Sequence, residues 1–156
     1  MDIVIHGPLL KQSDVCGPIL RALPEWFGIE EATAQYIEAI EHMPTLIAEA
    51  NQRTLGFLTI KHHNEYSAEI HVMAILPDYH REGIGRALVQ QAEGVLRQEG
   101  IQFFQVKTVS SANRCKYYAR TRQFYLSMGF RPLEEFPTLW GANNPCLQMV
   151  KWLGNQ

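Results

Sequence analysis

The sequence has no apolar run of the roughly 20 residues that a membrane-spanning helix needs. Its first residues lack the basic segment and apolar stretch of a secretory signal peptide. No internal repeat, low-complexity tract or linker interrupts the 156 residues, a length typical of one domain. We therefore expect a single soluble, cytoplasmic domain covering residues 1–156, with no membrane partner.

The sequence is also poor in cysteine and has no excess of positive charge. Cys16, Cys115 and Cys146 are odd in number and share no metal-ligand spacing, which favours free thiols over disulfides or zinc. The formal net charge is −2, whereas proteins that bind nucleic acid through its phosphates are usually basic. We predict no bound metal and no nucleic-acid partner.

The periodicity of apolar residues predicts a mixed α/β order of elements. Candidate strands have short apolar or alternating runs, and they lie at 2–6, 45–50, 54–62, 67–76, 102–109, 130–133 and 147–153. Candidate helices repeat apolar residues every three or four positions, and they lie at 13–22, 30–42, 84–99 and 115–127. Ser13 and Asp14 are expected to cap the first helix, and Pro24 to stop it.

A glycine-containing loop at residues 80–86 joins the expected strand at 67–76 to the following helix. A helix N-terminus has unpaired amide donors and a partial positive charge, so it can bind an anion. Gly83 and Gly85 let a ligand approach the backbone, and Arg81 and Arg86 add positive charge. The loop therefore indicates an anion site, although a plain loop-to-helix junction would accommodate the same two glycines. The third glycine of G-x-G-x-x-G and the lysine of the P-loop motif are both absent.

The loop reads His80-Arg81-Glu82-Gly83-Ile84-Gly85, and it resembles the (Q/R)-x-x-G-x-(G/A) motif of the GNAT acetyltransferase superfamily. His80 stands where the family usually has Gln or Arg. Residues 124–130, Phe-Tyr-Leu-Ser-Met-Gly-Phe, are similar to the family pattern F-Y-x-x-x-G-F. Over roughly residues 45–152, the expected strands, loop and helices follow one another in the order typical of the family. The resemblance implies an α/β fold with a mixed, mostly antiparallel sheet of six to seven strands, flanked by about four helices.

The same resemblance implies acetyl-CoA as the acyl donor, with its pyrophosphate on backbone amides between Arg81 and Arg86. Ile75 matches the strand position whose main chain contacts the pantetheine, where the family's strand splays from its neighbour. Tyr118 stands where the family often has a cofactor-contacting Asn, and its role stays open. The predicted cofactor-binding residues are Ile75, His80, Arg81, Gly83, Ile84, Gly85 and Arg86.

Acetyl transfer to an amine requires a base for the amine and an acid for the departing thiolate. The resemblance implies Glu69 as the base, and a partly dry site would raise its pKa. His71, on the same strand face by alternation, is the rival base or a relay through water. A paired structural role for Glu69 is the alternative. Tyr125 is the candidate general acid because of its place in the second motif.

The predicted function is an acetyl-CoA-dependent N-acetyltransferase that moves an acetyl group to a primary amine by direct attack in a ternary complex. The acceptor would be a small molecule or a protein side chain. One alternative is a catalytically silent CoA-binding sensor or interaction module. Another is a toxin-like enzyme acting on charged transfer RNA, which the net charge disfavours. A homodimer could form if strand 147–153 is an exposed edge.

Overall fold

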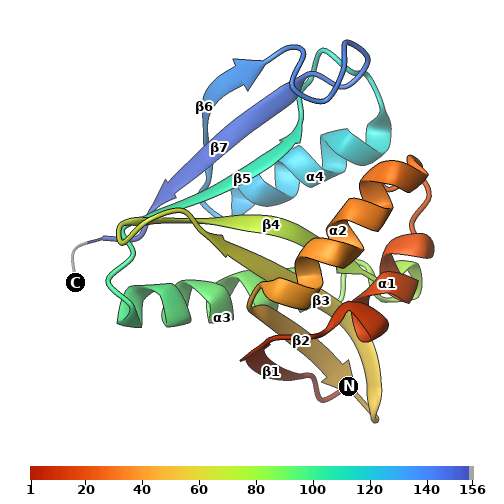
Figure 1. Ribbon diagram of the computed structural model, residues 1–156, viewed down its shortest axis with the longest axis vertical. Coiled ribbons are helices and arrows are strands. Elements are labelled where there is room, and N and C mark those ends of the chain that lie inside the picture. The colour runs from red at the N-terminus through yellow and green to blue at the C-terminus, as the bar shows by residue number, and fades with distance from the viewer. Residues whose placement is uncertain (155–156) are drawn as a thin grey trace. The chain divides into compact units, whose positions relative to one another are not determined.

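The computed structural model describes residues 1–154, which form one seven-stranded sheet in the order β1-β2-β3-β4-β5-β7-β6 (Figure 1). The strands are β1 (Val4–Leu9), β2 (Thr45–Ala50), β3 (Arg53–His62), β4 (Ser67–Ile75), β5 (Phe103–Val109), β6 (Arg131–Phe136) and β7 (Cys146–Trp152). The helices are α1 (Ser13–Arg21), α2 (Glu30–His42), α3 (Ile84–Gln98) and α4 (Lys116–Ser127), with a short 3₁₀ helix, η1 (Pro77–Tyr79). The β4–β5 pair is parallel, and the β1–β2, β2–β3, β5–β7 and β6–β7 pairs are antiparallel. The predicted fold class is confirmed.

Three details of the sequence prediction are wrong. β7 lies between β5 and β6, so the strands at the edges of the sheet are β1 and β6. β1 continues past residue 6 through Pro8, which an edge strand tolerates because its outer amides have no ladder partner. Ser13 does not cap α1, since its hydroxyl donates to the Glu41 carboxylate instead.

The chain divides into two compact units. Unit 1 consists of Met1–Lys61 and His71–Val95, and unit 2 of His62–Ile70 together with the described part of Leu96–Gln156. β4 and α3 each contribute residues to both units. That residues 1–156 behave as a single domain stays a prediction.

Unit 1 has an apolar core to which α1 contributes one face. Cys16, Ile19 and Leu20 repeat on one face of this helix and are at most 3% exposed. They pack in one cluster with Ile40 of α2 and Phe57 of β3. This core supports the part of unit 1 in which β4 ends and the glycine loop begins.

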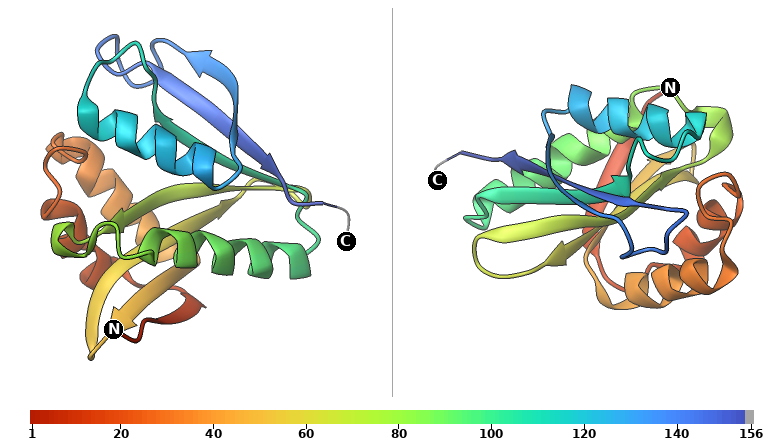
Figure 2. Two further views of the ribbon diagram at one scale, coloured as in Figure 1. Left: turned by 180° about the vertical axis from the view of Figure 1, so that it is seen from behind. Right: turned by 90° about the horizontal axis from the view of Figure 1, so that it is seen from above.

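Unit 2 packs α4 against one face of its strands (Figure 2). The Phe130 ring lies 5.6 Å from that of Phe104 on β5 and 5.7 Å from that of Tyr125 on α4. Because side chains alternate along a strand, the neighbours of Phe104 point to the other face. Gln105 and Lys107 of β5 therefore share that face, and Glu69 of β4 is the register partner of Gln105.

Candidate active site

In unit 1 the chain turns sharply between the end of β4 and the start of α3. Arg81 has φ 66° and Gly83 has φ 81°, so two residues of the loop adopt the left-handed conformation. The first helical hydrogen bond runs from the Ala87 amide to the Gly83 carbonyl, at 3.0 Å. The amides of residues 83–86 precede that bond and have no carbonyl one turn earlier in the helix to accept from them.

Gly83 has open space beside its Cα atom. A Cβ atom built at this position would meet no heavy atom within 4 Å, so the glycine is needed for its φ angle rather than for internal packing. Ile84 is 1% exposed and anchors the first turn, while Arg81 and Arg86 are exposed. Backbone donors, two guanidinium groups and open space together suit a diphosphate, so the predicted cofactor-binding residues fit the group that the sequence implied.

His80 holds the loop to the end of β4. Its Nε2 atom donates to the Ile75 carbonyl oxygen at 2.8 Å, and its ring packs edge-on against Trp26 with centroids 5.6 Å apart. His80, which departs from the family motif, therefore forms a hydrogen bond within the protein that connects the loop to β4. Ile75 is also closely packed against Gly56. A Cβ atom added at Gly56 would lie 2.8 Å from Cγ1 of Ile75.

In unit 2, Glu69 lies at the centre of a polar cluster formed by His63, Glu69 and Lys107. Glu69 is 5% exposed. His63 Nε2 donates to Glu69 Oε1 at 2.7 Å, and Lys107 Nζ donates to Oε1 at 3.1 Å and to Oε2 at 2.9 Å. These three side chains come from the β3–β4 turn, β4 and β5. The carboxylate is thus paired with two potential cations rather than isolated.

The pKa of Glu69 is lower than its usual value of 4.5, and the expected rise is wrong. Burial alone would raise the pKa, but the hydrogen bonds and charges of Lys107 and His63 together outweigh burial. Glu69 is therefore ionised at neutral pH. Sequence reasoning did not find these partners, although alternation along β5 could have placed Lys107 on the same face as Gln105.

The two adjacent histidines at the end of β3 have different carboxylate partners. His62 Nε2 lies 3.2 Å from Glu99 Oε1, whereas His63 contacts Glu69. Adjacent side chains of an extended segment point in opposite directions, which fits the two different partners. His63 was not singled out in the sequence analysis, and its contact with Glu69 joins residues six positions apart across the β3–β4 turn.

The other candidate residues are distributed over both units. Tyr125 of unit 2 is 6% exposed and lies between the rings of Phe124 and Phe130. Tyr118 of unit 2 is half-buried, and burial raises its pKa, with a smaller contribution from Cys115. His71 of unit 1 is half-buried, with its ring 5.5 Å from that of Tyr36.

The cysteines are free thiols, as predicted. Burial raises the pKa of Cys16 to about 12 and that of Cys146 to about 11, so both thiols are neutral. Cys115 is partly exposed. Among residues 1–154, no three His, Cys, Asp or Glu side chains are grouped so that they could hold a metal ion. The described helices include none with both the length and the apolar character needed to cross a bilayer.

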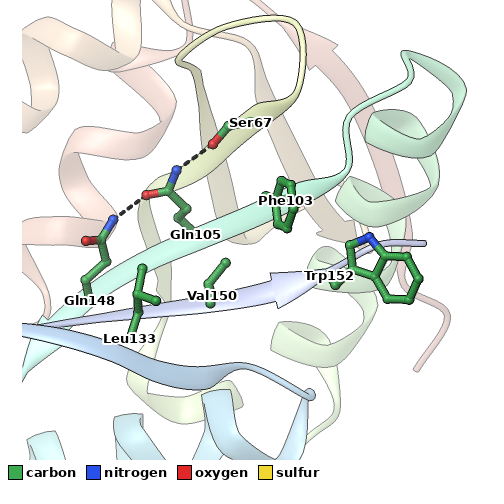
Figure 3. Close-up of a pocket in the computed structure, with 7 residues that line it drawn as sticks. All are labelled: Ser67, Phe103, Gln105, Leu133, Gln148, Val150 and Trp152. Carbon is green, nitrogen blue, oxygen red and sulfur yellow. Dashed lines mark hydrogen bonds between the residues drawn. The ribbon is translucent and has the colours of Figure 1, made fainter. Parts of the chain in front are cut away.

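A groove of about 480 Å³ lies on unit 2 beside the polar cluster (Figure 3). Its lining has no charged side chain and consists of Ser67, Phe103, Gln105, Leu133, Gln148, Val150 and Trp152. Figure 3 shows a chain of hydrogen bonds across it, in which Gln148 donates to Gln105, and Gln105 donates to Ser67 at 2.5 Å. The groove is therefore mostly apolar, with one polar strip that starts two residues from Glu69.

Comparisons with known proteins agree on one family. The family model described as "Acetyltransferase (GNAT) domain" matches residues 41–132. An uncharacterized N-acetyltransferase of Chlorobaculum tepidum is 31% identical over 111 residues, which make up 69% of this chain and 64% of that protein. The chain thus spans less than two-thirds of that relative.

Two solved structures share the fold at low identity. A putative acetyltransferase of the GNAT family from Desulfovibrio desulfuricans has a TM-score of 0.83 and 15% identity, covering 98% of this chain and 100% of its own. An aminoglycoside 6'-N-acetyltransferase complexed with coenzyme A has a TM-score of 0.76 and 17% identity, covering 100% and 99%.

Proposed function

Because the chain belongs to the GNAT acetyltransferase family, we propose that it transfers the acetyl group of acetyl-CoA to a primary amine. The acceptor is a small molecule or a protein side chain, and it attacks directly in a ternary complex. The observation that carries this proposal is the left-handed turn at Gly83, which leads into α3 and has open space beside Gly83 itself. The similar structure that is complexed with coenzyme A supports the choice of cosubstrate.

The residues that would hold acetyl-CoA lie in unit 1. The amides of residues 83–86 and the guanidinium groups of Arg81 and Arg86 would bind the pyrophosphate, and the main chain at Ile75 would contact the pantetheine. His80 would act through its bond to the Ile75 carbonyl, by holding the loop in place. Acetyl-CoA supplies an activated acetyl thioester.

Glu69 and Tyr125 are the proposed acid–base residues. Glu69 would promote removal of the proton from the amine, because it is an ionised carboxylate in the polar cluster. Tyr125 would protonate the departing thiolate, because a phenol can donate a proton with little rearrangement. An acyl intermediate on Cys16 or Cys146 is disfavoured because both thiols are buried and neutral.

The test is a thiol-release assay with acetyl-CoA across a panel of primary amines, with acetyl-CoA affinity measured by calorimetry. Glu69→Gln and Tyr125→Phe should lower kcat while acetyl-CoA still binds. Glu65→Gln and Tyr66→Phe are matched controls, because both residues are exposed in the β3–β4 turn, and they should keep full activity. Unchanged turnover in both Glu69→Gln and Tyr125→Phe would remove these assignments. Wild-type protein that binds acetyl-CoA but acetylates no amine would contradict the proposed function.

A further inference from the structure

The contacts of Glu69 leave little of its carboxylate available to a substrate. Oε1 accepts hydrogen bonds from both His63 and Lys107, and Oε2 accepts one from Lys107. The residue is only 5% exposed. The adjacent Lys107 charge also stabilises the ionised form, which makes Glu69 a weak proton acceptor. A group that removes a proton from an amine must present an accessible lone pair.

His63 offers such a lone pair. Its side chain is 30% exposed, and its Nε2 atom is engaged by Glu69. Since Nε2–H donates to a carboxylate, Nδ1 carries the lone pair of the neutral ring. In the described part of the chain, no residue makes a hydrogen bond to Nδ1 of His63.

We propose that His63 is the base of this acetyltransferase and takes the amine proton on Nδ1, with Glu69 as the residue that positions it. The inference rests on the proposed function, and it assigns the proton to a different residue of the same cluster. Glu69 fixes the tautomer and orientation of the ring and stabilises the imidazolium that forms, as a carboxylate does for a catalytic histidine in a triad.

The protons balance over the reaction. The N–H bond of the entering ammonium breaks, its electron pair stays on nitrogen, and a bond forms between that proton and Nδ1 of His63. The amine nitrogen then bonds to the acetyl carbon and loses a second proton, the carbon–sulfur bond breaks, and the thiolate receives one proton. One proton is therefore released to solvent per turnover, and the His63 side chain, which is partly exposed, is a route for it.

Other charged and titratable groups around His63 are consistent with this assignment. Lys107 of β5 holds Glu69 anionic, so the carboxylate accepts a hydrogen bond rather than the substrate proton. Cys146 of β7, which interacts electrostatically with Lys107 and Glu69, is a neutral buried thiol. Glu65, in the same turn as His63, is exposed.

The test compares His63→Ala with His62→Ala. His62 is a matched control because it is the adjacent histidine and also contacts a glutamate, Glu99. His63→Ala should lower kcat/KM roughly 10²- to 10⁴-fold, the usual effect of removing a general base. Its acetyl-CoA affinity should not change, the acid limb of its pH–rate profile should disappear, and added imidazole should restore activity. His62→Ala should match wild type in all four measurements.

A double variant separates the two possible bases. If Glu69 acts through His63, His63→Ala combined with Glu69→Gln should be no slower than His63→Ala alone. If the losses in kcat/KM of the two single variants multiply in the double variant, the inference would be overturned and Glu69 would be the base. A His63→Ala variant with wild-type kcat/KM would have the same consequence. Lost activity that imidazole does not restore, with an unchanged pH profile, would also overturn the inference. Wild-type protein without turnover on any amine would instead contradict the proposed function.

Discussion

Lys107 Nζ lies 2.9 Å from Oε2 and 3.1 Å from Oε1 of Glu69, so the ammonium group bridges both oxygens of a carboxylate that is 5% exposed. The two residues are 38 positions apart in sequence and meet because β4 and β5 are parallel neighbours. The pair keeps a buried carboxylate ionised, which is the state that the proposed role of Glu69 requires.

Loss of Lys107 alone should destabilise the protein strongly. Lys107→Met leaves the buried Glu69 charge with His63 as its remaining partner, and we expect the unfolding free energy to fall by about 3–5 kcal/mol. The measurement is urea unfolding near neutral pH. Lys107→Met combined with Glu69→Leu removes both charges and should recover most of the loss. A single variant as stable as wild type would show that the pair is not buried in solution.

Glu69 should make stability depend on pH in the acid range. Its pKa in the folded protein is below its usual 4.5, so its contribution is fully present above that value and is lost as pH falls through it towards the folded pKa. From about pH 6 to about pH 3, wild type should lose more unfolding free energy than Glu69→Gln. The other carboxylates are common to both proteins, so the difference between the two curves reports Glu69. Parallel curves would mean that its pKa is not lowered.

Two glycine substitutions in and before α3 should have opposite effects. Gly83→Ala places a side chain at φ 81° and should cost about 1–2 kcal/mol of stability. The new methyl group also enters the open space beside Gly83, where the pyrophosphate is proposed to bind, so acetyl-CoA should bind more weakly. Gly94 lies exposed in the middle of the helix, and an added Cβ atom there would meet no atom within 4 Å. Gly94→Ala should therefore raise the unfolding free energy by about 0.5–1 kcal/mol.

Thermal unfolding and calorimetry with acetyl-CoA check both glycine variants. Gly94→Ala should keep wild-type affinity, which controls for general effects on the helix. Equal affinities in all three proteins would show that the space before Gly83 is not where the cosubstrate binds.

Gly56→Ala should disturb the end of β4. The added Cβ would lie 2.8 Å from Ile75 Cγ1 and 3.0 Å from the Ala74 carbonyl oxygen, and the backbone contact cannot be relieved by rotating a side chain. We expect a loss of about 1–3 kcal/mol in stability and weaker acetyl-CoA binding through the displaced main chain at Ile75. Adding Ile75→Ala should recover only part of the stability, because it removes only the side-chain contact. Full recovery would mean that the backbone contact is not limiting.

Much of the fold could be read from local patterns. α2, predicted at 30–42, and β2, predicted at 45–50, have the bounds that the structure shows. The other elements differ by a few residues at their ends, where capping and pairing decide the boundary. The position of β7 between β5 and β6 could not be read locally, because strand order depends on which partners a strand finds in the sheet.

The sequence predicted the glycine loop of the candidate site but not the surroundings of Glu69. The glycine loop was found because its chemistry lies in consecutive residues, and the left-handed angles at Arg81 and Gly83 agree with a loop shaped by its backbone. The raised pKa expected for Glu69 was wrong, because its two partners lie on other segments of the chain. The roles of the individual residues stay predictions until the variants are measured.

The sequence by itself determined the secondary-structure elements, the position of the glycine loop and the family, because each depends on residues that are close together along the chain. The tertiary structure decided the electrostatic state of Glu69 and the partner of His80, because these depend on side chains that come together only when the chain folds. Burial raises the energy of a charge, and a neighbouring opposite charge lowers it. Which effect prevails at Glu69 is set by Lys107 and His63, and the same contacts make His63 the proposed base.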